Sequence, residues 1–301
     1  MKGAVVLPNV LFESGFTLDK HIFRYRRDSD INKNIDGIDI LVSSIVEEIQ
    51  GGSIWHSSVG ALNDPFEIYA KINPHEFKLM SEAQRINIWA TLSAKSKKHL
   101  GVMAYSQEQA FKLYCADKPD LQQTLDNTIE NSNAFQDLIS SVRGSIGIAC
   151  FTSVCDSRLM WGYYCNGFSG VCLIYNREKL FDNKVPLECV DYQDTPFEVD
   201  IINFVYNLNR QQQLNVLNQI VKTKHSEWSH EIESRSVIDL HAHEKGKGRL
   251  LKIEKRCIEG VIIGRNVRTD VRRKIEGLCK ILELKCFYAD VDYQVFGVKI
   301  T

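Results

Sequence analysis

The sequence predicts an α+β protein, on three observations. Strand-like runs cluster along the chain and do not alternate regularly with helices, which disfavours a doubly wound parallel sheet. Of the 301 residues, 44% are hydrophobic and 25% charged, the balance of an ordinary globular protein. The chain is long enough to bury a substantial core, and no repeat or glycine-serine linker marks a domain boundary. We therefore expect a single α+β domain over residues 1–301.

The N-terminal part predicts a strand, a helix and a second strand. Residues 21–27 read as a short strand, and residues 38–50 carry apolar side chains at helical spacing. The pair Gly51-Gly52 ends that helix, because glycine adopts the left-handed conformation without steric cost. Residues 53–57 alternate like a strand, and a turn follows at 63–65, where the proline bars helix at the preceding residue.

The middle of the chain predicts a helical insertion or lobe at about residues 76–143, where apolar residues such as Leu121, Leu125 and Ile129 keep helical spacing. The remaining strand-like runs are 146–151, 171–175, 187–192, 235–240, 257–263, 285–288 and 294–300. Further helices are expected at 197–224 and 270–284.

Charge and cysteine content limit the classes of function. Lys plus Arg total 37 against 38 for Asp plus Glu, so no overall field attracts nucleic acid or an anionic membrane. Residues 241–280 carry 12 basic and five acidic side chains, a net of +7, which fits either a phosphate-bearing partner or a solvated helix face. Nine cysteines without a C-x-x-C pair indicate a reducing cytoplasm and no zinc site. No apolar stretch is long enough to cross a bilayer, so we expect no membrane partner.

Two N-terminal segments contain candidate site residues. Arg24 and Arg26 fall on one strand face, and guanidinium groups bind phosphate or carboxylate with two hydrogen bonds. An edge strand kept soluble by charge is the alternative. In the turn, Asn63 or Asp64 can bond its own backbone, and Glu67 is a candidate to face a pocket.

Two later segments contain the remaining candidates. The strand that ends at Thr152 and Ser153 leads to Trp161, which fits either a ligand platform or the core. If the segment after Trp228 is a strand, Glu231, Glu233 and Arg235 share one face. Such a carboxylate pair suits a general base and a charge stabiliser, although a carboxylate-arginine ladder on a solvated face is the alternative. The pair His241 and His243 has no further ligands nearby, so we expect no metal.

The order of these segments resembles a bacterial family known as domain of unknown function 2971, some of whose members resemble abortive-infection proteins. The resemblance covers roughly residues 23–264. The matching motifs are Phe23-Arg-Tyr-Arg26, Ile54-Trp55, Asn63-Asp-Pro-Phe-Glu67, Cys150-Phe-Thr-Ser153, Leu159-Met-Trp161, Gly170-Val171 and Trp228-Ser-His-Glu-Ile-Glu-Ser-Arg235. Two departures are an extra residue in the C-F-S run and Ser234 in place of a usual aromatic residue.

The chain also resembles ADP-ribosyltransferases, through Arg24, Thr152-Ser153 and Glu231-Ile-Glu233 in that order. This resemblance implies a mixed, mostly antiparallel split sheet and NAD as a substrate. It implies that Arg24 grips the phosphates of NAD, that Ser153 supports the site, and that Tyr25 or Trp228 stacks on nicotinamide. Glu233 would hold the nicotinamide ribose and stabilise the oxocarbenium-like charge, with Glu231 activating the acceptor.

The leading hypothesis is therefore a cytoplasmic NAD-dependent ADP-ribosyltransferase-like or glycohydrolase-like enzyme, in phage defence or as a toxin component. Its acceptor would be a protein or a nucleic acid. One alternative is a non-enzymatic regulatory or protein-binding module of a defence or toxin-antitoxin system. The other is a nucleic-acid-processing enzyme that uses the basic C-terminal region. The enzyme hypothesis depends on one expectation, that Arg24, Ser153 and Glu233 share a cleft.

Overall fold

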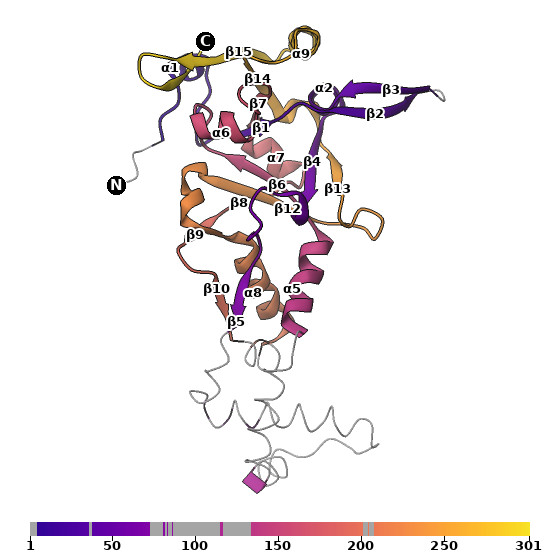
Figure 1. The fold of residues 1–301 in the computed structure, drawn as a ribbon, viewed down its shortest axis with the longest axis vertical. Helices are drawn as coiled ribbons and strands as arrows, with labels where there is room; N and C mark the ends of the chain where they lie inside the picture. The colour runs from indigo at the N-terminus through magenta and orange to yellow at the C-terminus, as the bar shows by residue number, and fades with distance from the viewer. Residues whose placement is uncertain are drawn as a thin grey trace. The chain divides into compact units, whose positions relative to one another are not determined.

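The structure is a computed structural model that describes residues 5–35, 38–72, 81, 83, 86, 115–116, 134–200, 204 and 208–301 (Figure 1). The chain divides into two compact units. Unit 1 comprises residues 1–63, 144–192 and 226–301, and unit 2 comprises residues 64–143 and 193–225. Most of the predicted helical insertion at 76–143 lies outside the described residues.

Unit 1 is built on a 10-stranded sheet, within the described part of the chain. Its main path runs in the order β13 (Gly248–Lys252), β4 (Ser53–Ser58), β6 (Ile146–Thr152), β1 (His21–Arg26), β7 (Val171–Asn176), β14 (Ile258–Gly264), β15 (Lys285–Asp292) and β16 (Gly297–Ile300). Off this path, β12 (Glu233–Asp239) pairs with β6 and β8 (Glu188–Cys189) pairs with β12. Strands β14 and β15 run parallel, and the other described pairs of the sheet run antiparallel. The predicted α+β class with a mixed, mostly antiparallel sheet is confirmed.

Strand β6 is the junction of this sheet. Strand β12 pairs along its whole length, from Asp239 opposite Ile146 to Glu233 opposite Thr152. On the other side of β6, β4 pairs near its beginning and β1 pairs at its end, where Phe23 lies opposite Thr152. One row across three strands therefore joins Phe23, Thr152 and Glu233, although these residues lie far apart in the sequence.

Helices cover both faces of the sheet. Because side chains alternate along a strand, neighbouring residues enter different cores. The face that we call the α2 face is covered by α2 (Ser44–Gly51), α7 (Arg177–Asp182) and α9 (Thr269–Ile281), with Ile22 and Leu173 in its core. The opposite, α6 face is covered by α1 (Asn9–Glu13) and α6 (Arg158–Tyr163), with Phe23 and Trp161 in its core.

The prediction of a helix at residues 38–50 is wrong for the first half of that segment. Residues Ile38–Ser43 form β3, which pairs with β2 (Asp30–Ile35) in a separate two-stranded hairpin. Helix α2 begins only at Ser44, because the Ser43 side chain accepts a hydrogen bond from the Val46 amide and caps the helix. At its other end Gly52 adopts the left-handed conformation, with φ of 58°, as predicted.

Two other predicted elements are shorter than expected. The strand predicted at 187–192 is divided into β8 and β9 (Asp191–Gln193). The helix predicted at 197–224 begins with β10 (Phe197–Val199), and its helical part is α8 (Arg210–Lys222) followed by β11 (Thr223–His225). Asn209 and Gln212 form a capping box, which makes α8 begin later in the chain than predicted.

The described part of unit 2 also contains β5 (Ala70–Ile72), which pairs in parallel with β10, and most of α5 (Ala134–Ser145). Three short 3-10 helices in unit 1 complete the described elements: η1 (Val59–Ala61), η4 (Ser226–Glu231) and η5 (Lys255–Cys257).

Candidate functional site

Two buried carboxylates meet where η4 ends and β12 begins. Glu231 is the last residue of η4 and Glu233 the first of β12, and both are almost fully buried. Ile232 between them has a φ of 44°, which is rare for a β-branched residue. This left-handed residue, and not the strand alternation that the sequence predicts, lets both carboxylates point inward while Ile232 remains exposed.

Each carboxylate has a polar partner inside unit 1. Arg235 donates to both carboxylate oxygens of Glu233, with distances of 2.8 Å from Nε and 3.3 Å from Nη2. The Tyr164 hydroxyl donates to Glu231 Oε1, and the Thr152 hydroxyl donates to the Glu231 carbonyl. These bonds fix the pair against the end of β6. Tyr164 packs on the core of the α6 face, so the pair belongs to that face.

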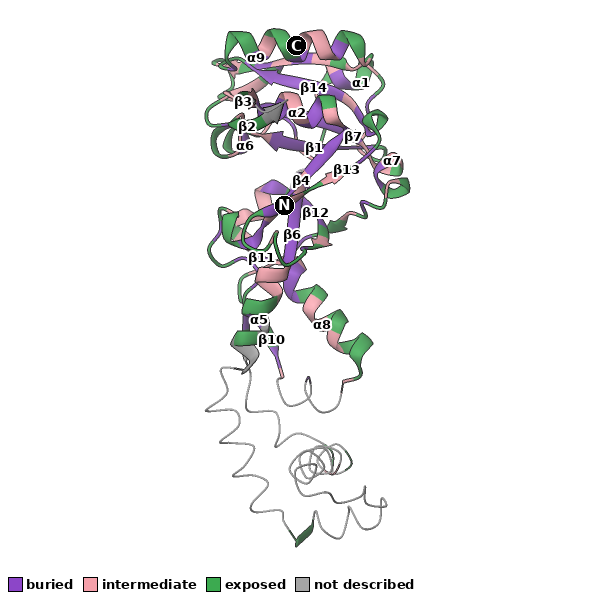
Figure 2. Ribbon diagram, turned by 90° about the vertical axis from the view of Figure 1, so that its right-hand side faces the viewer, coloured by how far each residue is buried: buried purple, intermediate pink, exposed green. Residues whose placement is uncertain are grey.

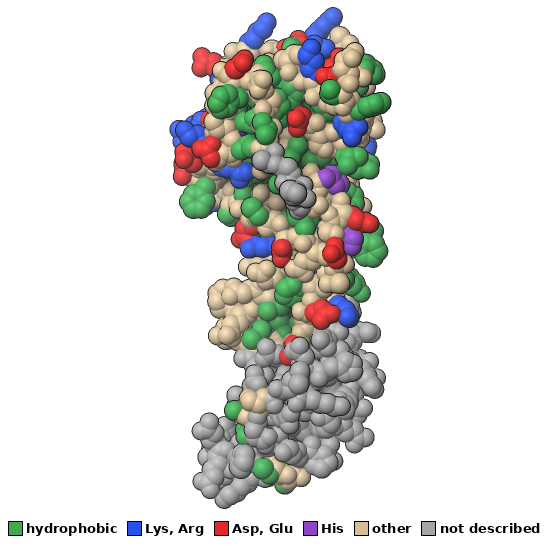
Figure 3. Space-filling model, turned by 90° about the vertical axis from the view of Figure 1, so that its left-hand side faces the viewer, with side chains coloured by type: hydrophobic (Ala, Val, Ile, Leu, Met, Phe, Trp, Pro, Cys, Tyr) green, Lys and Arg blue, Asp and Glu red, His purple; other side chains and the backbone are tan. Residues whose placement is uncertain are grey.

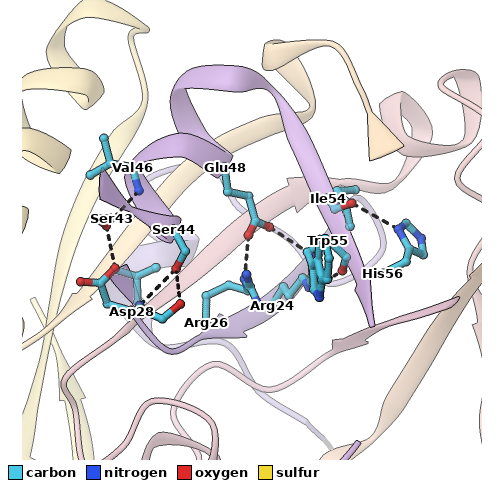
Figure 4. A network of polar contacts seen from close by, with 12 residues as sticks. Arg24, Arg26, Asp28, Ser43, Ser44, Val46, Glu48, Ile54, Trp55 and His56 are labelled. Carbon is cyan, nitrogen blue, oxygen red and sulfur yellow. Dashed lines mark hydrogen bonds and ion pairs between the residues drawn. The ribbon is translucent and has the colours of Figure 1, made fainter. Parts of the chain in front are cut away.

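Arg24 lies on the opposite face of the sheet. Phe23 shares a row with Thr152 and Glu233, and Arg24 follows Phe23, so its side chain enters the α2 face. There Arg24 donates to Glu48 Oε1 at 3.0 Å and to the Trp55 carbonyl (Figure 4). The expected shared cleft of Arg24 and Glu233 is not found, because each residue is buried in its own ion pair on a different face.

Glu48 organises this second polar cluster. Its other oxygen accepts from Arg26 Nε at 2.6 Å, and the Tyr175 hydroxyl donates to Oε1. Burial lowers the pKa of Arg26, but the Glu48 carboxylate outweighs it and raises that pKa overall. Burial and the same carboxylate raise the pKa of Tyr175, so its hydroxyl stays protonated. Nearby His56 is neutral, because burial and Arg24 lower its pKa to about 3.

The predicted aromatic platforms differ in their exposure. Tyr25 is buried in the α6-face core, edge-on to Trp161, and its hydroxyl accepts from the Ser157 amide. Trp161 is fully buried and donates to the Cys155 carbonyl, so it belongs to the core. Trp228 lies in η4, half-buried, with its ring 6.1 Å from that of His230. Of the three, Trp228 is the least buried.

The hydroxyl of Ser153 is held by Arg177. Arg177 Nη2 donates to Ser153 Oγ at 3.4 Å and its Nε donates to the His21 carbonyl. The Ser153 amide donates to the Ile232 carbonyl, so Ser153 adjoins the strained residue between the two glutamates.

The predicted turn at 63–65 lies at the boundary between the units. Asn63 is exposed, and Asp64 accepts from the Phe66 amide, which is the predicted Asx-turn. In unit 2, Glu67 is buried and forms an ion pair with Lys224 at 3.2 Å. Glu67 therefore has a structural partner that the sequence alone did not suggest.

Two residues that contact the candidates, Glu48 and Tyr164, were not predicted as site residues from the sequence. Glu48 lies on the buried side of α2, next to Ile49. A charged residue within that apolar stripe was the sequence signal that could have identified it. Tyr164 stood in a segment of aromatic residues and had no separate signal. Among the described residues, no group of three or more His, Cys, Asp or Glu side chains is placed to hold a metal ion.

Comparisons with known proteins identify one similarity. A family model described as "Protein of unknown function (DUF2971)" matches residues 160–236, which confirms the resemblance to that family over this segment. The matched segment includes Tyr164, both glutamates and Arg235. No curated protein and no solved structure matches the chain. No described helix has the length and apolar character needed to cross a membrane.

Proposed function

Because residues 160–236 match a family without an assigned function, we propose a function from the site itself. We propose that the chain is an NAD-consuming enzyme, an ADP-ribosyltransferase-like transferase or NAD glycohydrolase, whose reaction takes place at Glu231 and Glu233. The observation that carries the proposal is the burial of both carboxylates on one face, across a residue with positive φ. Residues in such strained conformations cluster at active sites.

The electrostatics of the pair suit cleavage of a glycosidic bond. Glu233 accepts two charge-assisted bonds from Arg235, which favour its ionised form. A fixed anion in a water-poor site stabilises the positive charge that develops on the ribose as nicotinamide leaves. Glu231, held by the Tyr164 hydroxyl, is the base that activates water or an acceptor hydroxyl.

The strand order also supports this proposal. The ADP-ribosyltransferase resemblance rests on a first strand, a hydroxyl-bearing strand end and a Glu-x-Glu segment. These motifs lie in β1, at the end of β6 and at the start of β12, and the three strands are consecutive neighbours in the sheet. The phosphate-binding role implied for Arg24 is not part of the proposal, because Glu48 and the Trp55 carbonyl bind its guanidinium on the other face.

The test uses chromatography to measure the nicotinamide that the purified full chain releases from NAD. Glu233→Gln should lower the rate at least about 100-fold, the usual effect of removing an electrostatic stabiliser. Tyr164→Phe removes only the hydroxyl that holds Glu231 and should lower the rate by a smaller factor. Glu227→Gln is the matched control, since Glu227 is exposed on the same 3-10 helix, and its rate should equal that of the wild type. Absence of both NAD binding and NAD cleavage in the wild type would refute the proposal.

A second candidate is a non-enzymatic regulatory or protein-binding module. It is favoured by the enclosure of Arg24, Glu233 and Arg235 in ion pairs inside the sheet. In that case Glu233→Gln would lower the urea midpoint or weaken a partner complex, and no turnover would be lost, because none exists in the wild type.

A further inference from the structure

Helix α9 has two unlike sides. Val271, Ile275 and Cys279 are buried and fix the helix on the α2 face of the sheet. The opposite side is exposed in Figure 2 and carries Arg273 and Lys274 in the middle of the helix, with Lys280 in its last turn. Because the inner side is anchored in the core, these cations stand on a rigid support.

The outer cations of α9 differ from the basic residues around them. Arg265, Arg268 and Arg272 are neutralised by Asp290, by Asp28 with Asp30, and by Glu276. On the face in Figure 3, several other acidic and basic side chains of unit 1 also lie next to one another. By contrast, Arg273, Lys274 and Lys280 form no ion pair with any described residue. One acid, Glu276, lies within this basic stretch and is paired with Arg272, and the exposed acids Asp270 and Glu283 lie at its two ends.

Gly277 lies at the centre of these cations. On a helix, residues three and four positions apart are neighbours, so Arg273, Lys274 and Lys280 surround Gly277. A Cβ atom added at Gly277 would meet nothing within 4 Å, so no contact inside the protein requires glycine here. A glycine within a helix nevertheless lowers helix stability relative to alanine. At Gly277 the helix backbone is therefore not covered by a side chain of its own between the three cations.

We propose that the outer side of α9, comprising Arg273, Lys274, Gly277 and Lys280, binds the phosphate backbone of duplex DNA without reading its sequence. The three cations span about 10 Å of helix at a rise of 1.5 Å per residue. The same length of duplex carries about six phosphates. At Gly277, where no side chain projects, a phosphate can approach the helix between the cations.

Other partners fit this surface less well. An amphipathic helix binds a membrane by inserting its apolar side, but that side of α9 is buried in the protein core. A protein helix that packs at a glycine needs apolar neighbours, and here only Ile281 is apolar and exposed among the residues around Gly277. Duplex RNA has a deep, narrow major groove, whereas that of B-form DNA is about 12 Å wide and admits a helix.

The experiment measures binding of the full chain to a fluorescent 20-base-pair duplex DNA of arbitrary sequence, by anisotropy, between 50 and 200 mM KCl. With three phosphate contacts the logarithm of the association constant should fall with the logarithm of salt at a slope of about −2.7. Lys280→Gln should make the slope less steep by about 0.9. Gly277→Gln should weaken binding at every salt concentration and leave the slope unchanged, because it blocks approach without removing a charge.

The control is Arg256→Gln, which removes an exposed cation that is already paired with Glu254 and should leave binding unchanged. The triple variant Arg273→Gln, Lys274→Gln, Lys280→Gln should lose measurable binding at 200 mM KCl while keeping its thermal midpoint. The proposal is overturned if the wild type does not bind at 50 mM KCl or if the triple variant binds like the wild type. It is also overturned if duplex RNA or anionic vesicles compete better than unlabelled DNA. None of these substitutions involves Glu231 or Glu233, so the result is independent of NAD cleavage.

Discussion

The substitution Glu48→Gln tests whether Arg24 has a structural role. The Glu48 side chain is 1% exposed and that of Arg24 is 5% exposed, so their ion pair is screened from water. Removing one partner of a buried pair leaves an uncompensated charge and costs about 3–5 kcal/mol. We expect about 3 kcal/mol, because Arg24 keeps the Trp55 carbonyl and the face of the Phe151 ring, 5.6 Å away. Arg26 also loses its ion pair with Glu48, but its side chain is 20% exposed, so water solvates the guanidinium and this loss adds little to the destabilisation.

The measurement is urea unfolding followed by circular dichroism. At a slope of about 2–3 kcal/mol per molar urea, the midpoint should fall by about 1 M or more. The matched control is Glu47→Gln on the same helix. The ion pair of Glu47 with Lys33 joins side chains that are 27% and 45% exposed and is worth less than about 1 kcal/mol.

A double variant separates the charge effect from the loss of packing. Arg24→Gln in the Glu48→Gln background removes the unpaired cation and should restore part of the lost stability. If Glu48→Gln shifts the midpoint no more than Glu47→Gln does, the pair is not buried as described, and Arg24 becomes available again as a phosphate ligand.

Three further outcomes are expected. Buried His56 has a pKa of about 3, against an ordinary value of 6.5, so only the unfolded chain takes up a proton as the pH falls from 6.5 towards 3. Stability should therefore drop by about 2 kcal/mol between pH 7 and pH 5, and His56→Gln should reduce that drop in urea titrations. Ile232→Gly relieves the positive φ and should raise the free energy of unfolding by about 1 kcal/mol; a loss of stability would show that the turn is unstrained. Cys286 has a pKa lowered to about 7 by its hydrogen bond with Cys279, so its alkylation rate should have a midpoint near pH 7. Cys279→Ala, which removes the hydrogen-bond donor, should move that midpoint upward, and peptide mapping that finds another thiol reacting first would contradict this.

Local patterns predicted most strands of unit 1, because buried strands carry apolar runs whose ends are marked by glycine or polar residues. The region 30–43 was the main error. Its isoleucines suit a strand and a helix equally, and the capping hydroxyl of Ser43 decides where the helix begins. The grouping of Glu231 and Glu233 was predicted correctly, but by strand alternation, whereas the structure achieves it through Ile232.

The shared cleft could not be judged from the sequence. The face that Arg24 enters depends on which residue of β1 lies opposite Thr152, and this register is set by tertiary packing. A shift of one residue would have placed Arg24 on the face of Glu233. The burial of Glu48 likewise depends on the docking of α2 over β1.

The order in which unit 1 is assembled from the chain has a consequence for biosynthesis. Strand β4 must wait for β13, and β7 must wait for β14, so early strands leave the ribosome long before their neighbours are made. Pairing of such distant segments makes folding slow. Nascent chains that stop before residue 248 would expose the apolar edges of β4 and β7, and we expect them to be bound by chaperones or degraded. The sheet therefore first becomes complete once β16, its last strand in the sequence, has been made.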